Sequence, residues 1–64
     1  ASPDPTLTLA LEALPEKLRL PLVLCYSEGM SYAEIAETMR LPLTTVRSRI
    51  HYAKRELRKE LDAE

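Results

Sequence analysis

Residues 31–61 read SYAEIAETMRLPLTTVRSRIHYAKRELRKEL, and this stretch decides the fold. It opens on Ser31 and Glu34, which have the Ser-x-x-Glu spacing of a capping box at the start of a helix. We therefore predict a short helix from Tyr32 to about Met39. The turn that follows is Arg40-Leu41-Pro42, because proline cannot extend the preceding helix but can open the next one.

The next predicted helix, from Leu43 to Leu61, has the clearest period in the chain. Its apolar residues recur at steps of three and four, which places them in one stripe along a helix. The stripe consists of Leu43, Val46, Ile50, Ala53, Leu57 and Leu61. The opposite face consists of Thr44, Arg47, Ser48, His51, Tyr52, Arg55, Arg58 and Lys59. That face has no acidic residue between Thr44 and Arg55, whereas a solvated helix face usually mixes charges of both signs. The unmixed basic face indicates a functional surface.

A first helix is predicted near the amino terminus. Asp4 is a favourable N-cap and Pro5 suits the first helical position, so the helix should run from Pro5 to about Ala13. We expect residues 1–4 to be the end of a linker and residues 5–64 to form one domain, a fragment of a longer protein. The predicted fold class is all-α, a small four-helix domain that contains a helix-turn-helix.

A second helix is predicted from Pro15, as its first residue, to about Ser27. Gly29 can take the left-handed conformation that closes helices. Because this segment is apolar almost all round, it should be the buried helix of the domain. Pro21 lies in its interior, so we expect a continuous but bent helix; the alternative is a break, with Pro21 starting a separate helix.

Composition narrows the function classes. The 64 residues include one glycine and no phenylalanine or tryptophan, which favours a small helical domain. Cys25 is the only cysteine and His51 the only histidine, so we expect no internal disulfide, no metal site and no cofactor. There is no nucleophile–base pattern or glycine-rich loop, so we expect neither an enzyme nor a small-molecule substrate. Without an apolar run of membrane-spanning length or a signal peptide, the chain is predicted to be cytoplasmic.

Charge is strongly segregated along the chain, although the net charge is only −1. Residues 1–39 have two basic and six acidic residues, and residues 40–59 have seven basic residues and one acidic residue. The last five residues add three acids. Positive charge concentrated on one helix is typical of nucleic-acid binding.

The order of elements, a short capped helix, a turn and a longer helix with a basic face, predicts a helix-turn-helix that binds double-stranded DNA. An α-helix fits the major groove, where residues near its amino-terminal end reach base edges. Arg47 and Ser48 are placed for base contacts. Thr44 and Thr45, at the start of the helix, suit phosphate oxygens.

Several motifs resemble region four of bacterial sigma factors of the extracytoplasmic-function class. They are Leu14-Pro15-Glu16, Glu28-Gly29-Met30-Ser31-Tyr32, Glu34-Ile35-Ala36 and the run from Leu41 to Ile50. The most specific part is Thr45-Val46-Arg47-Ser48-Arg49, and the resemblance extends from about Leu11 onward. This chain differs from the usual family sequence at three positions. The family often has arginine where this chain has Cys25, a basic residue where it has Tyr52, and glycine where it has Thr44.

This resemblance implies a subunit that gives RNA polymerase its promoter choice. The domain would read the −35 promoter element, dock on the polymerase flap and be held inactive by an anti-sigma factor. The residues implied to face bases are Arg47, Ser48, His51 and Tyr52. The residues that we predict to contact the DNA backbone are Tyr32, Thr44, Thr45, Arg49, Lys54 and Arg55.

Two other functions remain open from the sequence. A two-component-type transcription regulator contains a similar four-helix module. The Arg47–Ile50 run and the Leu14-Pro15 pair before the second helix favour the sigma-factor interpretation. The chain could also act mainly as a protein-docking module, bound by an anti-sigma factor or by the polymerase, through apolar surface on its second helix.

Overall fold

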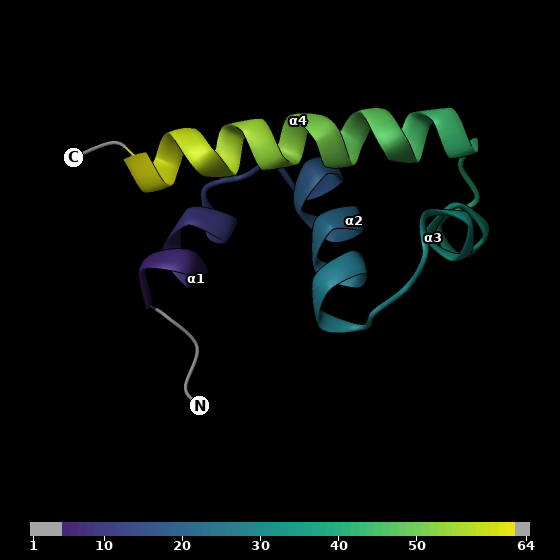
Figure 1. Cartoon of the computed structure of the whole chain (residues 1–64), viewed down its shortest axis with the longest axis horizontal. Coiled ribbons are helices and arrows are strands. Elements are labelled where there is room, and N and C mark those ends of the chain that lie inside the picture. Colours follow the sequence, from purple (N-terminus) through teal and green to yellow (C-terminus); the bar gives the residue numbers. More distant parts are fainter. Residues whose placement is uncertain (1–4, 63–64) are drawn as a thin grey trace.

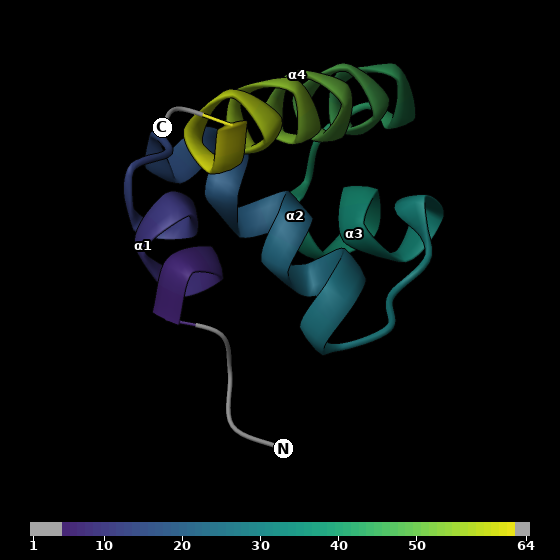
Figure 2. The same ribbon diagram turned by 60° about the vertical axis from the view of Figure 1, so that its left-hand side comes forward.

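A computed structural model describes residues 5–62, and these residues form four helices and no strand. The helices are α1 (Pro5–Glu12), α2 (Glu16–Ser27), α3 (Tyr32–Met39) and α4 (Leu43–Asp62). All three shorter helices pack against one side of α4, and both views show that the other side of α4 is not covered by any of them (Figures 1 and 2). The all-α, four-helix prediction is confirmed.

The core lies where α2 and α3 meet the apolar stripe of α4. It consists of Leu14, Leu22, Ile35, Val46, Ile50 and Ala53. The middle of the predicted stripe is therefore confirmed, but its two ends are not, because Leu43 is 37% exposed and Leu61 is 40% exposed. Both residues lie in the terminal turns of the 20-residue α4, whereas the core packs against its middle.

The start of α3 has the capping box that the sequence predicts. The Glu34 backbone N–H donates to Ser31 Oγ at 3.1 Å, and the Ser31 N–H donates to Glu34 Oε1 at 2.8 Å. The end of α3 is closed by a residue other than glycine, because Arg40 takes the left-handed conformation at φ 56° that glycine usually supplies. The Leu41 N–H then donates to the Ala36 carbonyl at 2.9 Å, which turns the chain toward α4.

Pro21 lies within one uninterrupted α2, so the alternative of a separate helix starting there is wrong. Its ring is fully buried, and this buried apolar surface offsets the backbone hydrogen bond that proline cannot donate. Pro15 is not the first helical residue as predicted. It precedes the helix with ψ 147°, and its carbonyl accepts from the Arg19 N–H at 2.9 Å, so α2 begins at Glu16.

The prediction that α2, apolar almost all round, is the buried helix of the domain is wrong. Only Pro21 and Leu22 are buried, whereas Leu20 is 43% exposed and Tyr26 is 65% exposed. Among the described residues, α2 packs against α3 and α4, which cover one side and leave the rest of its apolar surface open. The helix ends as predicted, with Gly29 in the left-handed conformation at φ 66°.

The first helix, α1, begins at Pro5 as predicted and ends at Glu12, one residue before the expected end. The predicted N-cap, Asp4, lies outside the described residues. Ala10 is the buried residue of this helix, while Leu9 on another side is 66% exposed. No helix within residues 5–62 is long and apolar enough to cross a membrane.

Candidate nucleic-acid interface

The uncovered face of α4 presents the residues predicted to read bases. Arg47, Ser48, His51 and Tyr52 are all exposed, and the side of α4 that faces away from the three shorter helices is uncovered (Figures 1 and 2). The rings of His51 and Tyr52 meet edge to face, with centroids 5.7 Å apart and planes at 69°. We call this surface the outer face of α4. It is open to a duplex, while base contact by each of the four side chains stays a prediction.

The rotation of α4 that exposes this face is set by its buried edge. Val46, Ile50 and Ala53 have essentially no exposed surface. A helix turns once every 3.6 residues, so clamping these three side chains inward fixes the direction of every other side chain on α4. Arg47 and Ser48, immediately after Val46, are thereby turned outward. The same pattern that builds the core therefore positions the functional side chains.

The six residues predicted to contact the DNA backbone fall into two groups. Thr44, Lys54 and Arg55 are exposed. Tyr32, Thr45 and Arg49 are half-buried. Half-burial is compatible with a backbone contact, because such a contact needs only the polar end of the side chain to reach solvent. Their individual roles stay predictions.

Most of the positive charge on α4 has no internal partner. In residues 5–62, Lys59 forms an ion pair with Glu56 at 3.1 Å, and the other pair, Arg19–Glu16 at 3.9 Å, lies within α2. The cations of residues 40–59 that have no carboxylate within ion-pair distance in the described part of the chain are Arg40, Arg47, Arg49, Lys54, Arg55 and Arg58. Uncompensated charge of one sign attracts a polyanion and accelerates its association.

Three side chains from three helices meet on one flank of the outer face. The Lys54 ammonium lies 5.8 Å from the centroid of the Tyr26 ring, and Tyr32 is close to the same ammonium. The charges that Tyr26 and then Tyr32 can carry raise the pKa of Lys54 above its ordinary value; desolvation opposes this increase, and hydrogen bonds to the two tyrosine oxygens add to it. The structure thus brings together two predicted backbone-contact residues, Tyr32 and Lys54. We call these three residues the Lys54 cluster.

Tyr26 is a member of this cluster that the sequence did not reveal. It lies at the end of α2, a helix predicted to be buried, and only the packing of α2 against α4 shows that its ring faces Lys54. A tyrosine in an apolar helix is more often a core residue, so no local pattern in the sequence distinguishes Tyr26.

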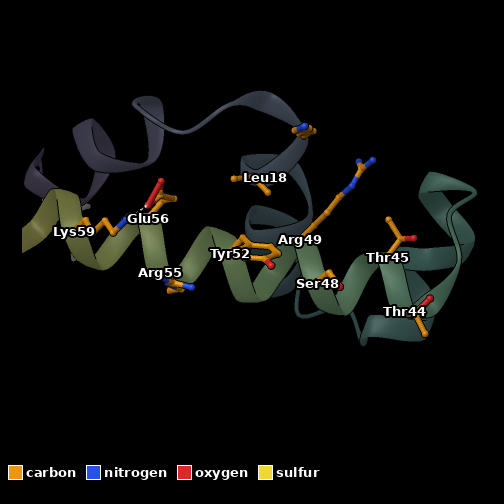
Figure 3. A pocket seen from close by; sticks show the side chains of 10 residues that line it. Leu18, Thr44, Thr45, Ser48, Arg49, Tyr52, Arg55, Glu56 and Lys59 are labelled. Carbon is orange, nitrogen blue, oxygen red and sulfur yellow. Dashed lines mark ion pairs between the residues drawn. The ribbon is translucent and has the colours of Figure 1, made fainter.

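An open groove of about 650 Å³ runs along the other flank of α4, beside the start of α2 (Figure 3). It is lined by Lys17, Leu18, Thr44, Thr45, Ser48, Arg49, Tyr52, Arg55, Glu56 and Lys59. In Figure 3, Arg49 extends away from the axis of α4 on the side where Leu18 lies. We call this the α2–α4 groove. Lys17 and Leu18 were not predicted to belong to the site.

A smaller hollow of about 390 Å³ lies farther along α4 and is lined by His51, Lys54, Arg55 and Arg58. These positions recur at steps of three and one, so they share one side of the helix. Every lining side chain ends in a nitrogen group and none is acidic, which suits phosphate oxygens. In the described part of the chain, no three His, Cys, Asp or Glu side chains gather where they could hold a metal ion.

Comparison with known proteins gives consistent matches. Residues 6–57 match the family described as Sigma-70, region 4. The chain is 50% identical over 52 residues to the ECF RNA polymerase sigma factor SigE of Mycolicibacterium smegmatis, which covers 81% of the chain and 20% of that protein. It is 43% identical over 58 residues to the RNA polymerase sigma-H factor of Pseudomonas aeruginosa, covering 91% of the chain and 30% of that factor. It is 44% identical over 48 residues to the ECF RNA polymerase sigma factor SigW of Bacillus subtilis, covering 75% of the chain and 26% of that factor. The chain therefore spans less than a third of the length of these relatives.

Proposed function

Because the chain belongs to the sigma-70 region 4 family, we propose that it binds double-stranded promoter DNA with the outer face of α4 in the major groove. The observation that carries this proposal is the uncompensated positive charge on a helix face that no other described helix covers. Such a face gives a duplex both an electrostatic attraction and room to approach. The relatives are named RNA polymerase sigma factors, which supports a role in transcription initiation. The proposed target is the −35 promoter element.

The proposed roles follow from chemistry and exposure. Arg47 can donate two parallel hydrogen bonds to the acceptor edge of a guanine. Ser48 can donate to or accept from a neighbouring base, and the His51–Tyr52 pair offers ring edges, with Tyr52 able to contact a thymine methyl. The proposed backbone contacts are Tyr32, Thr44, Thr45, Arg49, Lys54 and Arg55. Backbone contacts set the position of α4 but carry no sequence information.

A protein-docking role is proposed beside DNA binding. Leu9 and Leu20 are large exposed apolar side chains on α1 and α2. Exposed apolar residues of this kind support contact with a protein partner. In a complete sigma factor, we propose the flap of the RNA polymerase core and an anti-sigma factor as these partners. The matches favour this assignment over a two-component-type regulator.

The DNA-binding proposal is tested with Arg47→Ala. Duplexes bound by the 64-residue chain are first selected from a random pool, and dissociation constants are then measured by fluorescence anisotropy on the selected duplex and on single-base variants of it. We expect Arg47→Ala to cost about 1–3 kcal/mol on the selected duplex and to lose discrimination at one base pair.

Lys54→Ala is the matched control, because it removes a positive charge from the same helix at a proposed phosphate contact. It should weaken binding to all duplexes equally and lower the salt slope by about one unit. Equal loss on every duplex with Arg47→Ala would show that Arg47 does not read a base. If the wild-type chain selected no duplex, the proposed function would be wrong.

A further inference from the structure

We propose that the DNA contact surface continues across the α2–α4 groove onto α2, where Lys17 and Arg49 together hold a phosphate of the second DNA strand. This inference rests on the proposed function. It adds a residue outside the helix-turn-helix, and it assigns each flank of α4 to a different strand of the duplex.

The positions of Lys54 and Arg49 on α4 motivate the assignment of strands. They are five residues apart, which separates them by about 140° across the buried edge of α4 and by about 220° across its outer face. The middle of the outer face, near Ser48 and Arg55, lies between them. The Lys54 cluster therefore borders one flank of this face and the α2–α4 groove borders the other. A helix in the major groove has a phosphate backbone on each side, so each flank faces one strand.

The chemistry of the groove suits a phosphate. Lys17 contributes positive charge from α2 and Arg49 contributes it from α4, and neither forms an ion pair within the described residues. Glu56 is the only acidic residue in the lining, and its carboxylate is paired with Lys59 at 3.1 Å. Thr45 adds a hydroxyl on the same flank as Arg49 (Figure 3). A guanidinium, an ammonium and a hydroxyl are groups that commonly hold phosphate oxygens in protein–DNA complexes.

Lys17 is also poorly explained by the stability of its own helix. It is exposed and is the second residue of α2, where the partial positive charge of the helix terminus favours acids and disfavours bases. Its neighbour Glu16 follows that preference and Lys17 does not. A residue that breaks a local rule without a compensating contact is expected most often at a functional site. Removing the Lys17 charge should therefore leave the fold intact.

The test is Lys17→Ala in the 64-residue chain, measured on the selected duplex over a range of salt concentrations. Loss of one phosphate contact should lower the slope of log K against log salt by about 0.9 and weaken binding about 5- to 10-fold at 0.1 M salt. The loss should be the same for all base sequences. Arg19→Ala is the matched control, because Arg19 lies on the same helix, is paired with Glu16 and does not line the groove. It should leave the slope unchanged.

Phosphate ethylation interference assigns the strand. In the wild-type chain, ethylation of one phosphate should weaken binding in a way that Lys17→Ala abolishes, and this phosphate should lie on the strand opposite the one whose ethylation pattern changes with Lys54→Ala. An unchanged salt slope with Lys17→Ala, in a wild-type chain that binds the duplex and is impaired by Arg47→Ala, would overturn the inference alone; the groove would then fit an acidic protein segment instead. Absence of duplex binding by the wild-type chain would overturn the proposed function as well.

Discussion

The amino-terminal half of the molecule, with α1 and α2, and the carboxy-terminal half, with α3 and α4, differ in one respect. They differ in how well the sequence pattern of a helix determines which of its residues are buried. In α4, the apolar stripe and the basic face alternate with a clear period, and Val46, Ile50 and Ala53 are buried as the pattern requires. In α2, apolar residues occur on nearly every side, yet only Pro21 and Leu22 are buried. A contrast between two faces specifies how a helix is rotated in the fold, whereas a uniformly apolar helix does not.

The same difference between α2 and α4 shows which surfaces serve stability and which are available for function. The outer face of α4 contributes almost nothing to the core, so its side chains are free for a ligand. The exposed residues of α2 include the apolar Leu20 and the basic Lys17, so this helix offers contacts to a protein partner and to DNA. Function therefore lies in what each half leaves uncovered: positive charge on α4 and at Lys17, and apolar surface on α2.

The largest expected effect compares buried and exposed leucine-sized side chains in the two halves. Ile50→Ala should lower the free energy of unfolding by about 2–5 kcal/mol, because it removes a fully buried side chain from the centre of the core. Leu20→Ala, at a position 43% exposed on α2, should cost only about 0.5 kcal/mol. Urea denaturation followed by circular dichroism measures both.

Equal costs at Ile50 and Leu20 would break the comparison between the halves. That result would mean that the 64-residue chain covers Leu20 in solution, for example by self-association. A repeat of the denaturation at several protein concentrations separates the two cases, since only association makes the midpoint depend on concentration.

A smaller effect is expected at the capping box, the signal that best predicted the start of α3. Ser31→Ala should cost about 1 kcal/mol of unfolding free energy, because the Glu34 N–H loses its side-chain acceptor. Ser31→Asn, which also caps helices well, is the matched control and should restore most of the loss. A negligible cost for Ser31→Ala would show that packing of Ile35 alone fixes the start of α3.

The capping box also predicts a pH dependence. The hydrogen bond from the Ser31 N–H, and then that with the Ser31 side chain, lower the pKa of Glu34 below its ordinary value of 4.5, against a small effect of desolvation. A lowered pKa in the folded state means that the contribution to stability is present above pH 4.5 and is lost as the pH falls through the folded-state value. Glu34→Gln should reduce the slope of stability against pH in that acid range. An identical slope in wild type and variant would contradict this.

The fold was largely predictable because its boundaries are marked by local chemistry. Ser31, Gly29 and Pro42 mark the ends of three helices, and each acts through its own backbone or nearest neighbours. The ends of the α4 stripe and the exposure of α2 were not predictable in this way. They depend on where the other helices pack against a given residue, and the periodic pattern of one helix contains no information about that packing.

The candidate site was likewise predictable where it depends on one helix and not where it depends on packing between helices. The exposure of Arg47, Ser48, His51 and Tyr52 follows from the period of one helix. Tyr26 and Lys17 were missed, because they belong to α2 and reach the site only through the packing of α2 against α4. Contacts between elements distant in sequence leave no local signal in a single chain.

The last comparison concerns the two left-handed residues that close helices, Gly29 after α2 and Arg40 after α3. Gly29 closes α2 at φ 66°, and a Cβ added there would meet nothing within 4 Å, so Gly29→Ala should lose about 1 kcal/mol through backbone strain alone. Arg40 closes α3 at φ 56° with a side chain already present. Arg40→Gly should relieve that strain but increase the entropy of the unfolded chain, for a net gain of about 0.5 kcal/mol. Thermal denaturation of both variants tests for these opposite signs. A loss of stability with Arg40→Gly would mean that the Arg40 side chain contributes more to stability than its left-handed backbone conformation costs. The turn between α3 and α4 would then contain no unfavourable residue.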